Sequence, residues 1–183
     1  MLSRRGWLFV AVLALLSAAC VAVVLRERGS YDTTRRVALA VDTAQVDYLC
    51  IGAADGGATI KLCKPSNHWL AITSSDSVAM ADAVVGELLA AITVVDAERL
   101  MTNSESQWSQ YGVGTAGGTR VFVRGNGRVL ADFYCGNVDF DTSTRQLWTY
   151  VRNDSESAVY KTDGYLNLAI TRCVEVCKKL MQD

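Results

Sequence analysis

The stretch that decides the fold is "TRVFVRGNGRVLADFYCG", residues 119–136. Apolar and polar residues alternate on both sides of Asn126-Gly127, which is the pattern of half-buried β-strands. Asn-Gly favours the two-residue turns that join antiparallel strands, because both residues tolerate a positive φ. The stretch therefore predicts a β-hairpin, and with it an antiparallel sheet.

The residues just before this hairpin contain a glycine pattern like that of dinucleotide-binding proteins. "YGVGTAGG", residues 111–118, has Gly112, Gly114 and Gly117 in G-x-G-x-x-G spacing, with Asp132 further on. That fingerprint holds a pyrophosphate only where a strand enters the loop and a helix leaves it. Here a polar, helix-like segment precedes the glycines and a strand follows them. We therefore predict a joint between a helix and a strand, and no nucleotide cofactor.

The rest of the chain predicts further strands and three helices. After Ser74-Ser75-Asp76, which offer a helix cap, apolar residues recur at helical spacing. Strands followed by a helix, twice, predict an α+β fold: an antiparallel sheet with helices packed on one face, with the order suggesting a loose two-fold repeat. The predicted strands are 46–52, 58–64, 68–72, 145–153 and 157–162, and the predicted helices are 77–93, 96–110 and 163–183.

The start of the chain is strongly apolar. "WLFVAVLALLSAACVAVVL", residues 7–25, carries no charge and as a helix would span roughly 28 Å, close to the hydrocarbon thickness of a bilayer. Three interpretations stay open: an uncleaved membrane anchor, which we favour, a lipoprotein signal acylated at Cys20, and a cleaved signal peptide. We expect residues 1–25 to be the anchor, 26–41 a juxtamembrane linker and 42–183 the α+β domain.

Composition and scattered polar residues give no sign of catalysis. The net charge of −1, with acidic and basic residues interspersed, argues against a nucleic-acid partner. We interpret the only histidine, His68, as structural, and Asp139 and Asp141 as members of a solvated loop between strands. No catalytic, cofactor-binding or metal-binding residues are predicted.

The cysteines outside the apolar segment fall into two groups. Cys173 and Cys177 lie four residues apart on the apolar face of the last predicted helix, where core packing is more frequent than metal binding. Cys50 and Cys63 flank the first hairpin and could lie near one another on paired strands, which in an extracytoplasmic domain makes them candidates for a disulfide.

The order of these features resembles the family called domain of unknown function 4340. The matching residues are Trp69, Ala81-Asp82, Tyr111-Gly112, Gly136 and Tyr150-Val151-Arg152, within residues 42–180. The resemblance implies an inner-membrane protein of bacteria, anchored by one helix, with its domain outside the cytoplasm. It also implies an association with an ABC-type exporter or its auxiliary subunit, of the kind linked to gliding motility.

Two functions of different classes follow as expectations. The first is a non-enzymatic, membrane-tethered accessory protein that docks on the exporter, with Trp148 and Tyr150 as candidate contact residues. The second is a binding domain for an envelope glycan or lipid head group, with Trp69, His68 and Trp108 lining a pocket. An enzyme built on His68 or on the Asp139–Asp141 loop ranks third.

Overall fold

The computed structural model describes residues 36–57, 59–72 and 76–182. Within these ranges no helix has both the length and the apolar character needed to cross a membrane. The apolar segment 7–25 and Cys20 lie outside the described residues.

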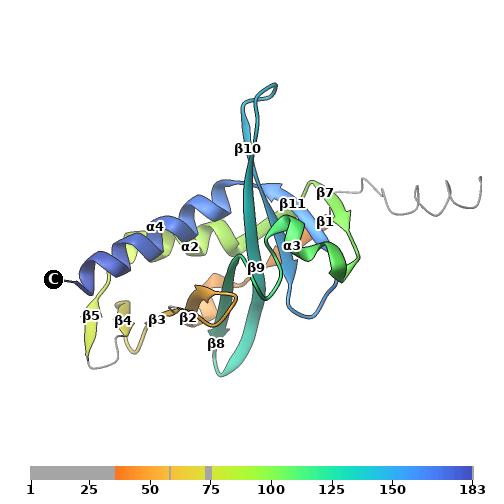
Figure 1. Ribbon diagram of the computed structural model, residues 1–183. Helices are drawn as coiled ribbons and strands as arrows, with labels where there is room; N and C mark the ends of the chain where they lie inside the picture. The colour runs from red at the N-terminus through yellow and green to blue at the C-terminus, as the bar shows by residue number, and fades with distance from the viewer. Residues whose placement is uncertain (1–35, 58, 73–75, 183) are drawn as a thin grey trace, which may run out of the picture. The chain divides into compact units, whose positions relative to one another are not determined.

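The described part is an α+β domain dominated by one large antiparallel sheet (Figure 1). Its strand order is β5-β4-β3-β2-β8-β9-β10-β11-β7, and β1 and β6 form a separate two-stranded sheet. The strands are β1 (Arg36–Ala40), β2 (Val46–Ala53), β3 (Thr59–Cys63), β4 (Leu70–Ile72), β5 (Ser77–Ala79), β6 (Val94–Ala97), β7 (Arg99–Thr102), β8 (Thr119–Gly125), β9 (Arg128–Asp141), β10 (Gln146–Asn153) and β11 (Val159–Asp163).

Two long helices and three short helical turns complete the domain. The long helices are α2 (Asp82–Thr93) and α4 (Tyr165–Leu180). The short elements are the single-turn helix α3 (Trp108–Tyr111) and the 3-10 turns η1 (Thr43–Gln45) and η2 (Glu105–Gln107). In the large sheet, the four consecutive antiparallel strands β2–β5 precede α2, and the four strands β8–β11 precede α4. The two groups meet where β2 pairs with β8.

The hairpin predicted from residues 119–136 is confirmed. Asn126 and Gly127 both have positive φ, 51° and 74°, as the two-residue turn between β8 and β9 requires. Strand β9 continues to Asp141, beyond the predicted hairpin, and pairs with β8 along its first half and with β10 along its second.

The main core lies between the sheet and the pair α2–α4, which run side by side (Figure 1). Alternate residues of β2, β8 and β9 point into it, among them Leu49, Val121 and Phe133, all fully buried. Helix α2 contributes Leu88, and α4 contributes Cys173 and other residues of its apolar stripe. This core is therefore built by apolar side chains that recur at the spacing of helices and strands, as the sequence predicts.

Two predicted helices are wrong in extent. Residues 77–79 form β5, paired with β4, and α2 begins only at Asp82; Asp76 accepts from the N–H of Ser77 but caps no helix, and Ser74 and Ser75 lie outside the described residues. Residues 96–110 form the end of β6, then β7, η2 and most of α3. Pairing with β1 and β11 overrides the local helical preference of this segment.

Two further expectations need correction. Residues 36–41, assigned to the linker, belong to the domain, because β1 pairs with β6 and Leu39 and Val41 are buried. The helices do not all cover one face. α2 and α4 pack on the face that carries Phe133, whereas α3 lies on the opposite face, against Tyr134 and Arg152.

Candidate functional site

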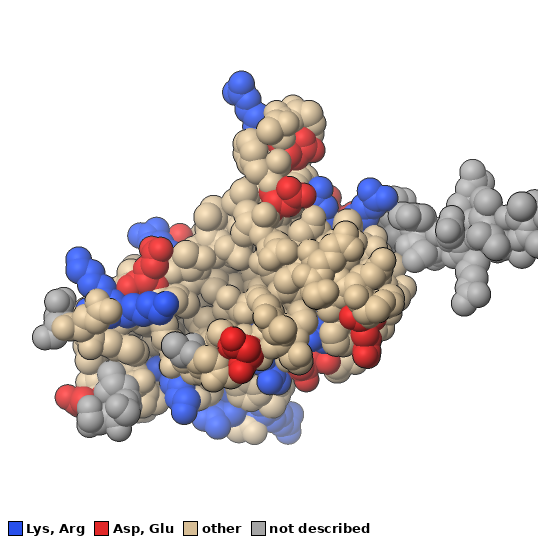
Figure 2. Space-filling view, in the orientation of Figure 1, with Lys and Arg blue, Asp and Glu red and all other residues tan. Residues whose placement is uncertain are grey.

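The outer ends of β9 and β10 form a hairpin that projects from the rest of the domain (Figure 1). Phe140 pairs with Leu147 in this projection, and Val138 with Thr149. The side chains of Val138 and Phe140 are 45% and 55% exposed. Acidic and basic side chains lie at its outer end (Figure 2). An exposed apolar strand pair outside the core is a candidate contact surface.

A β-bulge marks the base of this projecting hairpin. Between Val138 and Cys135, two residues of β9 stand opposite the single residue Tyr150 of β10. One of them, Gly136, packs so tightly that a Cβ there would lie 2.1 Å from the carbonyl oxygen of Tyr111. Asn137 donates its side-chain N–H to the carbonyl of Gln110, 3.1 Å away. The end of α3 therefore holds the base of the hairpin through close backbone contacts.

The glycine loop before β8 takes part in the same packing. Gly112, with φ of 67°, ends α3 in the left-handed conformation. A Cβ on Gly118 would lie 2.0 Å from the carbonyl oxygen of Gly112 and 3.0 Å from that of Cys135. A helix enters this loop and a strand leaves it, as predicted, so its glycines permit close approach of three backbone segments.

A buried arginine organises the face on which α3 lies. Arg152 of β10 is 2% exposed, and its guanidinium lies 3.8 Å from the ring centre of Trp108 and 4.2 Å from that of Tyr134. Its Nε donates to the carbonyl of Val113, and its Nη1 to the carbonyls of Asn153, Asp154 and Glu156. The guanidinium is thus stacked between two rings and bonded to backbone oxygens, an arrangement that suits arginine alone.

The stack continues across the sheet to β8. Arg120 lies 5.6 Å from the ring centre of Tyr134 on the neighbouring strand. It makes a two-pronged ion pair with Asp132, at 2.8 and 2.7 Å, which raises the pKa of the guanidinium. The hydroxyl of Tyr134 donates to Asp154, 3.1 Å away. The polar groups of these four side chains satisfy one another.

Three of the four aromatic residues predicted for interaction lie on this face. The Tyr150 ring lies 4.9 Å from that of Tyr111, and Lys161 stands over the Trp148 ring at 4.3 Å. Trp108 stacks on Arg152 and donates its indole N–H to the carbonyl of Ser157.

The fourth aromatic residue lies elsewhere. Trp69 is 3% exposed in the main core, on the other side of the sheet from Trp108. The pocket expected from Trp69, His68 and Trp108 is therefore wrong, since these residues do not face one cavity.

Asp139 and Asp141 lie at the end of β9, not in a loop as predicted. Asp139 accepts from the hydroxyl of Tyr150 at 3.3 Å, and burial together with the charge of Asp139 raises the pKa of Tyr150. Asp141 accepts from the hydroxyl and the backbone N–H of Ser143 and from the N–H of Thr144, which lowers its pKa to about 2. Each carboxylate thus has a local structural contact.

His68 pairs with Asp82 at the start of α2. The distance between Nδ1 and the carboxylate oxygen is 3.2 Å, and the other oxygen of Asp82 accepts from the backbone N–H of Trp69. These two hydrogen bonds, the backbone one first, lower the pKa of Asp82. The pair joins the start of β4 to α2, which agrees with the structural interpretation of His68.

The cysteines of the described residues are all free thiols. Cys173 and Cys177 are fully buried, as predicted, and contact between the two thiols together with burial raises the pKa of Cys173. Cys50 lies opposite Lys61, and Cys63 opposite Tyr48, so the two half-buried thiols are diagonal neighbours on one face. Diagonal positions are farther apart than a disulfide allows, so the predicted bond is not present in this register.

The residues behind the family resemblance fall into two contact groups. Trp69 and Asp82 meet at the start of α2, and Tyr111, Gly136 and Tyr150 meet at the bulge. Sequence reasoning missed Arg152 as the centre of its face, because a charged residue in a strand of alternating polar and apolar residues is expected to face solvent. Comparisons with family models, curated proteins and solved structures gave no match for this chain. The resemblance therefore stays a prediction.

Proposed function

We propose that this protein is a non-enzymatic, membrane-tethered accessory protein of the bacterial cell envelope that works with an ABC-type export system. The apolar segment 7–25 and the family resemblance support the tether and the setting. We infer that the globular domain lies outside the cytoplasm at the inner membrane. The two groups of four strands and a helix support a loose two-fold repeat.

The exposed apolar side chains of the projecting hairpin are the observation that supports a docking role. A hairpin that served only the fold would place Val138 and Phe140 against the core, yet both are about half exposed. The bulge and the contacts of Gly136 with α3 fix its base, so little ordering entropy is lost when it binds. A fixed apolar projection is typical of a surface that another protein covers.

The experiment is to extract the full-length tagged protein from its native cell in mild detergent and to identify co-purifying proteins by mass spectrometry. We expect ABC exporter subunits to be enriched over the background seen with an unrelated anchored protein. The variant Phe140→Ser should lose this enrichment, whereas Val129→Ser, which changes an equally exposed valine elsewhere on β9, should keep it.

The result that refutes the proposal is also specific. If the protein is intact and membrane-bound but no exporter subunit is enriched, the association with an exporter is wrong. Enrichment that survives Phe140→Ser would keep the accessory role and remove the hairpin from it.

A further inference from the structure

We propose that three sulfur atoms, gathered where the start of α2 meets α4, form a binding site for a monovalent copper ion, Cu(I). The sulfur cluster consists of Met80, Cys173 and Cys177, whose side chains belong to the main core and are 4%, 0% and 0% exposed. The inference goes beyond the proposed function and does not depend on it.

Two parts of the fold bring these sulfurs together. Cys173 and Cys177 lie four residues apart in α4 and therefore on one face of the helix. Met80 lies between β5 and α2, and its backbone N–H donates to the carbonyl of Trp69 at 2.8 Å, which fixes its position. The Sδ atom of Met80 lies 3.7 Å from the Sγ atom of Cys177.

The sulfurs form a chain of weak hydrogen bonds. The thiol of Cys173 donates to that of Cys177, and the thiol of Cys177 donates to the thioether of Met80. The hydrogen bond from Cys173 lowers the pKa of the Cys177 thiol. Cys177, which contacts both other sulfurs, is thus the thiol that loses its proton more readily. A bound metal ion takes the place of thiol protons, which pass to solvent.

The spacing of the sulfurs suits a metal ion at their centre. Three sulfurs at a metal–thiolate distance of about 2.3 Å from one ion lie about 4 Å from one another. The 3.7 Å between Met80 and Cys177 is close to this separation, so a small side-chain rotation is sufficient. The ion would occupy space that the thiol hydrogens now hold, and a separate cavity is therefore not required.

The types of ligand decide which metal the sulfur cluster fits. Thiolates and thioethers are soft ligands, and Cu(I) prefers them. A structural zinc site needs four ligands from Cys, His, Asp or Glu. Among the described residues, no third side chain of these four types joins the two thiols in a metal-binding group. Two thiols completed by a thioether therefore favour Cu(I) over Zn(II).

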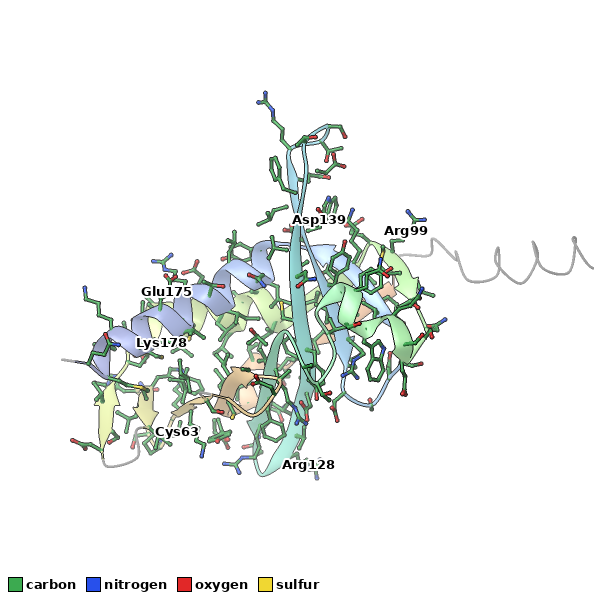
Figure 3. The ribbon with its side chains drawn as sticks, viewed as in Figure 1. Cys63, Arg99, Arg128, Asp139, Glu175 and Lys178 are labelled. Carbon is green, nitrogen blue, oxygen red and sulfur yellow. The ribbon has the colours of Figure 1, made fainter. Side chains whose placement is uncertain are left out.

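The end of α4 offers an ion a short route to the sulfur cluster. Cys177 lies three residues before Leu180, the last residue of the helix. The exposed residues Glu175 and Lys178, which Figure 3 labels, flank Cys177 in the chain. The buried thiol is therefore about one helical turn from the end of the helix.

The test is a titration of the full-length protein with Cu(I) in mild detergent, under reducing and oxygen-free conditions. The coloured Cu(I) chelator bicinchoninate competes for the ion and reports how much of it the protein binds. We expect the protein to withdraw one Cu(I) per chain from the chelator. X-ray absorption of the loaded protein should show three sulfur neighbours at about 2.3 Å.

Variants assign the ion to the sulfur cluster. Met80→Leu keeps the apolar volume and so preserves the fold. It should weaken Cu(I) binding by more than about tenfold, since even the loss of a ligand's outer hydrogen-bond partner typically costs that much. Its matched control is Met101→Leu, in the small cluster on the other face, which should bind like the unchanged protein. Cys177→Ala should abolish binding, whereas Cys63→Ala, which removes a half-buried thiol elsewhere, should not.

The other outcomes overturn the inference. If the protein withdraws no Cu(I), the sulfur cluster is core packing alone. If Met80→Leu binds as tightly as the unchanged protein, or if Cys63→Ala loses the ion, other thiols hold the copper. Displacement of Cu(I) by an equal amount of Zn(II) would show that the choice of metal is wrong. None of these results changes whether exporter subunits co-purify, so the proposed function is tested separately.

Discussion

The two faces of the sheet are stabilised in different ways. Beneath α2 and α4, apolar side chains such as Leu88 and Phe133 are buried in a large continuous core. On the opposite face, a small cluster surrounds Arg152, which stacks on two rings and donates to backbone carbonyls. A core stabilised by buried apolar area tolerates the exchange of one apolar side chain for another of similar volume. Stacking and directed hydrogen bonds are lost when the side chain that makes them is exchanged. The stability of the face around Arg152 therefore depends on which side chains are present, whereas the stability of the main core depends on the apolar volume that is buried.

The largest expected effect is a cavity in the main core. Phe133→Ala removes a fully buried ring from the centre of β9 and should lower the free energy of unfolding by about 3–5 kcal/mol. Denaturant unfolding of the full-length protein in detergent measures this. A loss below 1 kcal/mol, by the same order-of-magnitude scale, would mean that the core does not depend on this ring.

The sharpest test of the comparison sets two conservative exchanges side by side. Arg152→Lys keeps the charge but loses the planar stack and most of the hydrogen bonds, and should cost about 2–3 kcal/mol. Leu88→Met keeps apolar volume in the main core and should cost less than about 1.5 kcal/mol. If thermal or denaturant unfolding showed that the two variants lose equal free energy of unfolding, the proposed difference between the two faces would be wrong.

A single methyl group tests the packing at the bulge. In Gly136→Ala the new Cβ would meet the carbonyl oxygen of Tyr111, and we expect a loss of about 1–3 kcal/mol. Gly86→Ala in α2 is the matched control, because nothing lies within 4 Å of its Cβ and alanine favours the helix. The control should be neutral or stabilising, and a neutral Gly136→Ala would show that α3 does not hold the hairpin tightly.

The smallest effect concerns the outer end of the hairpin, which belongs to neither face. The pKa of Asp141 is lowered to about 2, first by the Ser143 hydroxyl and then by two backbone N–H groups. Stability from this depressed pKa is therefore present above the ordinary value near 4 and is lost as the pH falls through about 2. Ser143→Ala should raise the Asp141 pKa toward its ordinary value, measured by NMR titration of the carboxyl carbon. An unchanged pKa would contradict the hydroxyl contact.

Local chemistry predicted one part of the fold well. Asn126-Gly127 has few alternatives to a tight turn, and the alternation around it assigned β8 and β9. The apolar stripe of α4, including Cys173 and Cys177, likewise agrees with its burial. These elements depend on neighbours in the chain, and so the sequence pattern is sufficient.

Tertiary contacts decided the elements that the sequence could not predict. β6 and β7 are strands only because β1 and β11 pair with them. The role of Arg152 depends on Trp108, which lies 44 positions away in the chain and is brought near by the glycine contacts at the bulge. The exposure of Val138 and Phe140 depends on how far the hairpin projects beyond the core, and the alternation of residues along β9 does not encode that.

The pairing of β2 with β8 has a consequence for how the chain folds during its synthesis. Residues 46–53 leave the ribosome some seventy positions before their partners, residues 119–125. Until β8 arrives, β2 and β3 can form a hairpin, but one edge of β2 remains unpaired while α2 lacks α4 beside it. The nascent first half thus exposes sheet edge and apolar helix surface together, which makes it the stage at which aggregation or chaperone binding is most expected.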